Sequence, residues 1–156
     1  MPAACISPRK APSPGRRENK ELYMPLKDAL QRSLPPISRW LGIEITDASN
    51  DRIAAEVVVR EEHAIETGTI HGGAIMAIAD TLGALGTIVN LRKDQWTTTL
   101  ESKTNFLGPS PVGTKILCES LPLHRGRRTQ IWQTTMRNEA GKLIAQITQT
   151  QMVLEA

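Results

Sequence analysis

The sequence predicts an α+β domain in which one long buried helix packs against an antiparallel sheet of about six strands. Three observations lead to this fold class. A run of small and apolar residues from Gly72 to Val89 has the length of a helix. Segments in which apolar and polar residues alternate, as in half-buried strands, stand on both sides of this run. Gly-containing turns separate the segments after it, as expected of consecutive hairpins.

The N-terminal region differs in composition from the rest of the chain of 156 residues. Residues 1–25 are rich in Pro and Ser and carry five Lys or Arg against two Glu, whereas basic and acidic residues balance over 26–156. We therefore expect a disordered basic tail over 1–25, followed by one domain over 26–156. Because the positive net charge belongs to the tail, no nucleic-acid partner is predicted.

The tail and the cysteines bear on the cellular compartment. The tail lacks the apolar central segment of a secretory signal, although its Arg-rich character leaves an organelle transit peptide open. The two cysteines, Cys5 and Cys118, form neither a disulfide framework nor a zinc-binding pattern. A reducing compartment, and hence the cytoplasm, is the predicted location.

The first element of the domain is a short amphipathic helix over 26–34. Leu26, Leu30 and Leu34 recur in it at a spacing of four, and the following prolines end it. Alternating residues and turn sequences such as "GPSPVG", "HRGR" and "NEAG" place the strands. Six strands are expected, over residues 42–48, 52–59, 97–106, 114–123, 128–137 and 142–154.

The long helix is predicted to be apolar on all sides, so a sheet on one side cannot bury it completely. Either the sheet curls around the helix or a second subunit covers the rest. Small residues, Gly83 and Gly86 among them, allow a close approach that a strongly curved sheet would use. The single charge of Asp80 at the centre argues against a membrane-spanning helix and marks a candidate site.

Several motifs resemble one family. "GTIHGGAIMAIADTLG" resembles the signature of hotdog-fold acyl-CoA thioesterases of the PaaI-like branch, and "NFLGPSPVG" and "PLHRGRRTQIWQ" are similar to turns and hairpins of that branch. The resemblance covers about residues 40–154. It implies a hotdog fold, in which the curved sheet wraps the central helix, and an acyl-CoA substrate with an aryl or fatty acyl group. It also implies no metal, no cofactor apart from the CoA of the substrate, and a homodimer that pairs into a tetramer.

The helix start and Asp80 suggest a mechanism for thioester hydrolysis. Backbone N–H groups at Gly72 and Gly73 suit the oxygen of a thioester carbonyl, which becomes an oxyanion during attack. Asp80 would activate water as a general base or attack as a nucleophile. Gly72 and Asp80 are about 12 Å apart along one helix, too far to act on one carbonyl. If both act, they come from different chains, and the resemblance implies the same.

Other candidate residues follow from position and type. His71 is interpreted as a positioning residue, and Thr99 matches a Ser/Thr that holds the attacking water in related thioesterases. Ile65 stands where many relatives have Asn or Gln to orient the substrate, with Glu66 or His63 as conceivable substitutes, and Phe106 stands where the proofreading enzymes have His. The acyl group is expected against Ile75, Ala79 and Leu82. A cationic hairpin could bind the CoA phosphates. Its residues are His124, Arg125, Arg127 and Arg128.

Alternative interpretations remain for the site and for the function. Asp80 could be a structural group bonded to backbone amides, His71 a helix cap, Thr99 an ordinary strand residue, and the basic hairpin a solvated turn. Because Ile65 cannot hydrogen-bond through its side chain, the scaffold could bind acyl-CoA without turnover. A hydratase acting on enoyl thioesters is the third function, but it usually needs an Asp and a His that work together, and His71 is far from Asp80 along the helix.

Overall fold

The computed structural model of this protein describes residues 24–155. The tail predicted over 1–25 lies almost entirely outside the described residues. The helices are α1 (Leu26–Ser33), α2 (Pro36–Trp40) and α3 (Gly72–Ile88), with a short 3-10 helix η1 (Glu61–His63). The strands are β1 (Glu44–Ser49), β2 (Arg52–Val58), β3 (Gln95–Phe106), β4 (Lys115–Arg125), β5 (Thr129–Asn138) and β6 (Leu143–Glu155).

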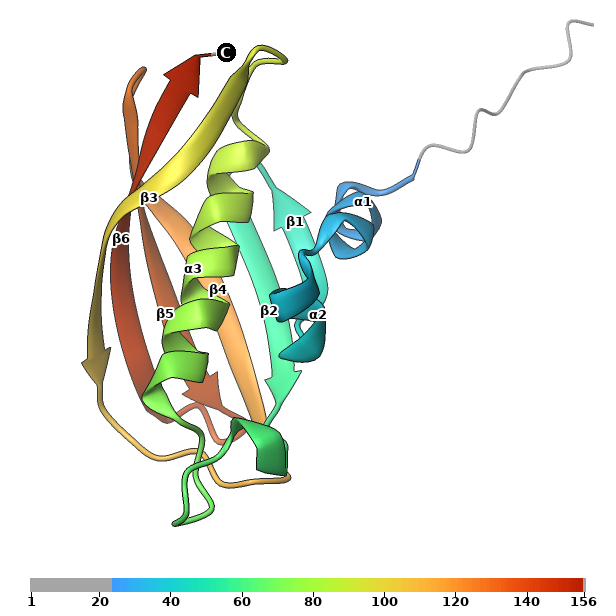
Figure 1. Ribbon diagram of the computed structural model, residues 1–156, viewed down its shortest axis with the longest axis vertical. Helices are drawn as coiled ribbons and strands as arrows, with labels where there is room; N and C mark the ends of the chain where they lie inside the picture. Colours follow the sequence, from blue (N-terminus) through green and yellow to red (C-terminus); the bar gives the residue numbers. More distant parts are fainter. Residues whose placement is uncertain (1–23, 156) are drawn as a thin grey trace, which may run out of the picture.

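The six strands form one curved antiparallel sheet in the order β1-β2-β4-β5-β6-β3. Helix α3 lies along the concave face of this sheet, and α1 and α2 lie beside it near β1 (Figure 1). Strands β1 and β3 are the two edges. The predicted α+β class, with one long helix against a sheet of six strands, is confirmed. Of the helices in residues 24–155, none combines the length and the apolarity needed to cross a bilayer.

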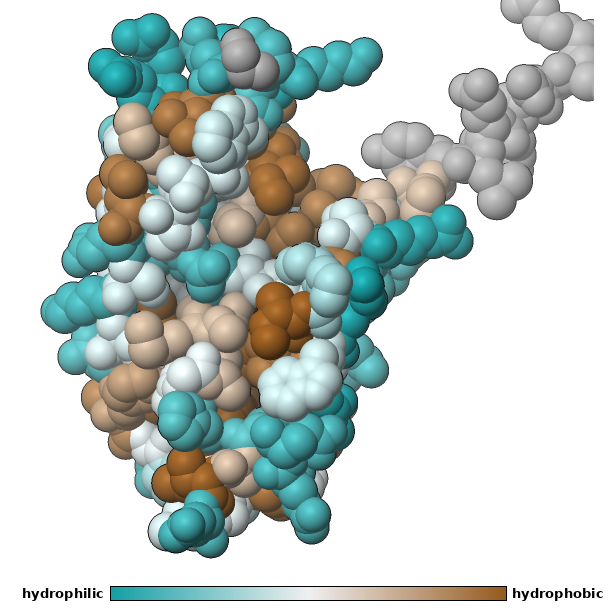
Figure 2. All heavy atoms as spheres, in the orientation of Figure 1, coloured by the Kyte–Doolittle hydropathy of each residue, from teal (hydrophilic) through white to brown (hydrophobic). Residues whose placement is uncertain are grey.

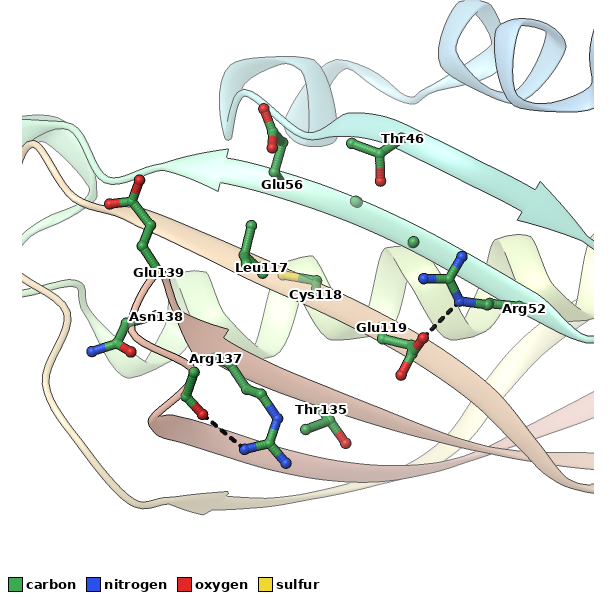
Figure 3. Close-up of a pocket in the computed structure, with 13 residues that line it drawn as sticks. Thr46, Arg52, Glu56, Leu117, Cys118, Glu119, Thr135, Arg137, Asn138 and Glu139 are labelled. Carbon is green, nitrogen blue, oxygen red and sulfur yellow. Dashed lines mark hydrogen bonds and ion pairs between the residues drawn. The ribbon is translucent and has the colours of Figure 1, made fainter.

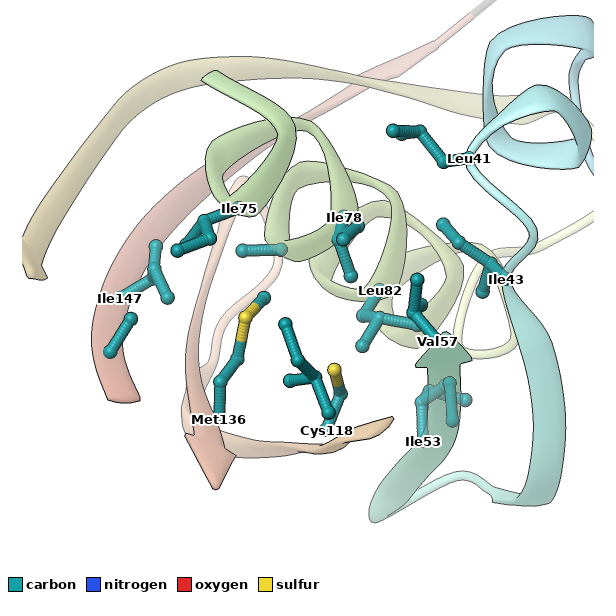
Figure 4. Close-up of a cluster of buried hydrophobic side chains, with 14 of the residues drawn as sticks. Leu41, Ile43, Ile53, Val57, Ile75, Ile78, Leu82, Cys118, Met136 and Ile147 are labelled. Carbon is teal, nitrogen blue, oxygen red and sulfur yellow. The ribbon is translucent and has the colours of Figure 1, made fainter. Parts of the chain in front are cut away.

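The core lies between α3 and the sheet. The residues of α3 that face the strands include Ile75, Ile78 and Leu82; Ile75 lies on the side of Met136 of β5 and Ile147 of β6, and Leu82 lies beside Val57 of β2 (Figure 4). Their spacing of three to four residues along the sequence keeps them on one side of the helix. Leu30 of α1 joins the same core, which explains the apolar stripe of that short helix.

Strand β4 is longer than expected, because the predicted strand ends at residue 123. The register of β4 against β5 shifts between Pro122 and His124. Pro122 has no N–H to donate, so pairing is irregular there and resumes afterwards. His124 and Arg125 therefore belong to the strand and are not part of the turn.

Two glycines of α3 permit the close approach of helix and sheet. A Cβ at Gly83 would lie 2.6 Å from Oε1 of Gln149, and one at Gly86 would lie 2.8 Å from the ring of the buried Trp132. Both distances are shorter than any normal contact. The small residues of this helix therefore serve tight packing against the curved sheet, as predicted.

The packing at Gly86 leads to a stability prediction. We expect Gly86→Ala to lower the free energy of unfolding by about 1–2 kcal/mol, because forcing an extra carbon against a packed ring costs more than the roughly 1 kcal/mol that Ala gains over Gly in a helix. Urea unfolding measures this. The control Ala84→Gly, on the same helix, should lose only the propensity difference of about 1 kcal/mol. A Gly86→Ala protein more stable than the wild type would contradict the packing described.

Candidate active site

Asp80 lies at the middle of α3, half-buried, on the side of the helix that faces β3 and β6. The hydroxyl of Thr99 donates a hydrogen bond to Asp80 Oδ1 at 2.7 Å. Nε2 of Gln149 lies 3.1 Å from the same Oδ1 and 3.1 Å from the backbone carbonyl oxygen of Asp80. Oδ2 accepts no hydrogen bond from residues 24–155 and is not buried. The carboxylate is thus held on one oxygen and open to solvent on the other.

The partners of Asp80 extend into a second layer on the sheet. Nε2 of Gln151 donates to Thr99 Oγ1 at 2.7 Å, and Thr97 Oγ1 lies 2.9 Å from Oε1 of Gln151. Gln149 and Gln151 are 1% and 0% exposed. Of this network the sequence predicts only Asp80 and Thr99 as site residues. The missed signal is the pattern along β6, where two glutamines occupy inward positions that alternation assigns to apolar residues.

Thr99 matches by position a residue that holds the attacking water. In this structure its hydroxyl proton is directed at Asp80, because an ionised carboxylate can only accept a hydrogen bond. Thr99 therefore contacts the carboxylate itself, and its other neighbour is the Gln151 amide.

The start of α3 is organised by His71. Its Nδ1 accepts a hydrogen bond from the N–H of Gly73 at 2.8 Å, which makes His71 the N-cap of the helix. The N–H of Gly73 is therefore already used in the helix cap, and the expectation that it donates to an oxyanion is not supported. The N–H of Gly72 has no acceptor among residues 24–155 and remains the free donor. The ring of Phe106, 54% exposed, lies 3.1 Å from where a Cβ of Gly72 would stand.

Gly72 and Asp80 are eight residues apart on a continuous helix. The rise of an α-helix separates them by about 12 Å, so within one chain they cannot act on the same carbonyl group. His71 and Asp80 are likewise not paired: His71 contacts Gly73 and Asp80 contacts the sheet. Within one chain, the open Asp80 carboxylate and the free Gly72 N–H are therefore separate features of the same helix.

The loop before the helix places Ile65 at a turn closed by the N–H of Gly68 donating to the Ile65 carbonyl at 2.9 Å. Ile65 is 43% exposed. The two expected substitutes for a polar side chain at this position lie in different surroundings. Glu66 points to solvent, and His63 is buried beside Trp40, with their ring centroids 5.2 Å apart.

Ile75 is expected from the sequence to contact the acyl group, together with Ala79 and Leu82. The structure buries all three in the core against the sheet, with Ile75 only 3% exposed. They lie on the inner side of α3 because the helical repeat aligns them with Ile78. We therefore do not assign substrate contacts to them.

The cationic hairpin is divided between two environments. Arg125 pairs with Asp51 at 2.5 Å and donates to the side chain of Asn90, just after α3, at 3.2 Å. It thereby ties β4 to the β1–β2 turn and is already engaged. Arg127 and Arg128 are exposed and line a shallow groove along Met152–Glu155, while His124 is exposed beside Gly126. This hairpin lies at the end of the sheet where α3 finishes, opposite Gly72.

A groove of about 380 Å³ lies on the other face of the sheet, over β1, β2, β4 and β5 (Figure 3). Arg52 pairs there with Glu119 at 2.6 Å. Cys118 lies beneath this groove, and burial raises the pKa of its thiol to about 12. The Cys118 thiol is thus protonated at neutral pH and is a poor nucleophile. Within residues 24–155, no cluster of three or more potential metal-binding side chains occurs.

Comparison with known proteins gives matches across this site. Residues 67–145 match the model of the Thioesterase superfamily. The chain is 30% identical over 121 residues to the proofreading thioesterase EntH of Cronobacter turicensis, which covers 77% of this chain and 87% of that protein. The crystal structure of thioesterase HI1161 from Haemophilus influenzae aligns with a TM-score of 0.77 and 30% identity, over 85% of this chain and 92% of that chain.

The fold recurs in a more distant structure. The E. coli PaaI protein from the phenylacetic acid degradation operon aligns with a TM-score of 0.75 at 17% identity, over 83% of this chain and 92% of that chain. The predicted hotdog fold and the predicted family are confirmed by these matches. The matched region includes the helix that carries His71, Gly72 and Asp80 and most of the sheet around it. The chain therefore belongs to the thioesterase superfamily and is a thioester hydrolase.

Proposed function

We propose that this protein hydrolyses acyl-CoA thioesters at a site shared by two subunits, with Asp80 of one and the N–H of Gly72 of the other acting on the same carbonyl. The observation that carries this proposal is the Asp80 carboxylate, held on Oδ1 and open on Oδ2, in a chain whose free helix N–H is about 12 Å away. The two half-sites on one helix fit a reaction centre completed by a second copy.

The chemistry requires a base or nucleophile and an oxyanion donor. As a general base, Asp80 Oδ2 takes a proton from water while the water oxygen bonds to the thioester carbon and the carbonyl oxygen becomes an oxyanion held by the Gly72 N–H. Collapse of this intermediate breaks the C–S bond, and the CoA thiolate leaves and takes up the proton. As a nucleophile, Oδ2 would instead attack the thioester carbon and displace the CoA thiolate, forming an anhydride that water then hydrolyses to the free acid and the Asp80 carboxylate.

The surface supports pairing with a second copy. The outward side of α3 carries small and apolar residues, and the surface over this helix is mostly tan and white, with hydrophilic groups towards the ends and sides of the molecule (Figure 2). Strand β3 is an unpaired edge with exposed Trp96 and Leu100. An edge strand with unpaired backbone groups is a template for pairing with another chain. A two-fold dimer about this side would bring Gly72 of one subunit towards Asp80 of the other; we propose that dimers pair further into a tetramer.

The acyl group has a candidate position beside the helix start. A pocket of about 370 Å³ is bounded by Ile37 and Trp40 of α2 and by Ala74 and Ala77 of α3, and it reaches His71. Its lining is mainly apolar, which suits an aryl or fatty acyl chain. At the other end of the substrate, the exposed Arg127 and Arg128 are the hairpin cations free to meet CoA phosphates.

Release of free thiol from a panel of aryl-CoA and fatty acyl-CoA thioesters tests the function. We expect hydrolysis of at least one thioester at a rate well above that of the uncatalysed reaction. Tight binding of acyl-CoA without thiol release would favour the non-catalytic binding protein. Loss of enoyl absorbance from an enoyl-CoA, without thiol release, would favour a hydratase. Either result would overturn the proposal.

A further inference from the structure

The hydrogen bonds around Asp80 distinguish its two carboxylate oxygens. Resting on the proposed function, we propose that Gln149 and Gln151 are positioning residues that hold Asp80 Oδ1 as an acceptor and leave Oδ2 as the oxygen that reacts. Neither glutamine is placed to touch the substrate, since both are buried beneath α3. Gln149 contacts Asp80 directly, whereas Gln151 acts on Asp80 through Thr99.

The direction of each hydrogen bond follows from the charge on Asp80. An ionised carboxylate only accepts, so the Thr99 hydroxyl must donate to Oδ1. The Thr99 oxygen then has lone pairs for a donor, and Gln151 supplies its Nε2–H at 2.7 Å. This orientation turns Oε1 of Gln151 towards Thr97, whose hydroxyl lies 2.9 Å from this oxygen and 2.9 Å from the carbonyl oxygen of Met152, its two acceptors. The donors thus run in one sense from β3 and β6 to Asp80.

Gln149 provides the second hydrogen-bond donor to Asp80, and another side chain could not easily take its position. Its Nε2 reaches both Oδ1 and the backbone carbonyl of Asp80, so it holds the side chain relative to its own helix backbone. The Gln149 amide occupies space directly beside Gly83, where any Cβ would come within 2.6 Å of it. The absence of a side chain at residue 83 is what lets the amide reach Asp80 one helical turn away.

The pairing register of β3 and β6 fixes the position of Gln151 relative to Thr99. Thr99 and Gln151 are direct partners across β3 and β6, and the register shifts between Thr99 and Glu101. This bulge changes which side chains of β3 face α3: Thr97 and Thr99 face it before the bulge, and Ser102 faces it afterwards. Bulges re-aim side chains next to active sites in this way. Because Oδ1 carries both donors, water and thioester can approach only the open Oδ2.

The test replaces each amide with a side chain of similar length that cannot donate. In the full chain, we expect Gln149→Met and Gln151→Met to lower kcat by about tenfold to a hundredfold, with KM changed by less than about twofold, because a misaligned carboxylate slows the reaction without removing substrate contacts. Gln146→Met, on the same strand but on the opposite face, is the matched control and should keep the wild-type kcat. Unchanged kcat in both glutamine variants, with Asp80→Asn inactive, would refute this inference while leaving the proposed function intact.

The order of action gives a second test. If Gln151 acts through Thr99, the double variant Thr99→Val/Gln151→Met should be no slower than Thr99→Val alone. If the losses in kcat of the two single variants multiply in the double variant, Gln151 acts independently of Thr99. That result would contradict the relay from Gln151 through Thr99 to Asp80. A merely structural role would also produce independent losses, so this cycle separates the two.

A measurement without turnover separates the positioning role from catalysis. In the ¹⁵N-labelled full chain, Asp80→Ala should shift the side-chain amide signals of Gln149 and also of Gln151, which does not touch Asp80, while leaving that of Gln146 in place. An unmoved Gln151 signal would overturn the relay. A wild type that hydrolyses no thioester would refute the proposed function, and these signals would still decide whether the two glutamines hold Asp80.

Discussion

Replacing Asp80 with asparagine is expected to lower kcat by about 10²- to 10⁴-fold while leaving the fold intact. Oδ1 accepts from Thr99 and Gln149, so the asparagine oxygen takes that place and its amide nitrogen takes the place of the open Oδ2. The variant keeps the hydrogen bonds and loses the reacting oxygen. Thiol-release kinetics measure the loss, and urea unfolding should show near-wild-type stability.

Asp80→Ala is the contrasting variant. It removes the carboxylate acceptor of the Thr99 hydroxyl, which costs about 1–3 kcal/mol for a buried polar group, whereas the Gln149 amide keeps the backbone carbonyl of residue 80 as its acceptor. We expect Asp80→Ala to be both inactive and less stable than Asp80→Asn. If Asp80→Asn hydrolysed thioesters at the wild-type rate, Asp80 would be a structural carboxylate and the proposed mechanism would be wrong.

Removing the Gly72 N–H is expected to lower kcat by about 10²- to 10³-fold, the usual loss for one oxyanion donor. Gly72→Pro does this with little damage to the helix, because Gly72 is the first residue of α3 and proline is favoured there. The preceding His71 has φ −70° and ψ 138°, which is the extended conformation that a residue before proline adopts. Gly72→Ala keeps the N–H, and its Cβ meets only the exposed Phe106 ring, so it should retain more activity.

The Gly72→Pro variant also tests whether two chains share the site. Co-expressed with Asp80→Asn, it should form mixed dimers in which one site has both an intact Gly72 and an intact Asp80. Random pairing would restore about a quarter of the wild-type rate, although each variant alone keeps at most about a hundredth of it. If mass spectrometry shows mixed dimers but no activity is recovered, both groups of a working site lie in one chain. The shared site is then excluded.

Most of the fold follows from local patterns. The apolar run from Gly72 predicts α3, and the alternation and turn residues predict the strand ends to within about two residues, since they report which side chains face a core. Long-range pairing leaves no such local signal. Strand β3 lies beside β6, which is the last strand in the chain, and no turn residue indicates that neighbour. The extra length of β4 depends on how Pro122 disturbs pairing with β5.

The candidate site divides in the same way. The spacing of His71, Gly72 and Asp80 is visible in one short stretch of sequence, because all three lie on one helix or at its cap. The role of Arg125 is not visible there, since it is bonded to a neighbour that only the folded chain provides, whereas the cap that uses the Gly73 N–H is formed within that stretch by His71. The burial of Ile75 was not foreseen because a helix that is apolar all round does not reveal which side faces the sheet.

The chain's own residues were thus enough to specify the order of helices and strands, the family, and a lone carboxylate on the central helix. Tertiary structure decided what surrounds that carboxylate. Thr99 and Gln151 are 52 residues apart and meet only because β3 pairs with β6 in one register. A slip of one residue would turn both side chains to the opposite face of the sheet. Register is a property of the assembled sheet, and for that reason the donors to Asp80 could not be inferred before the strands were placed.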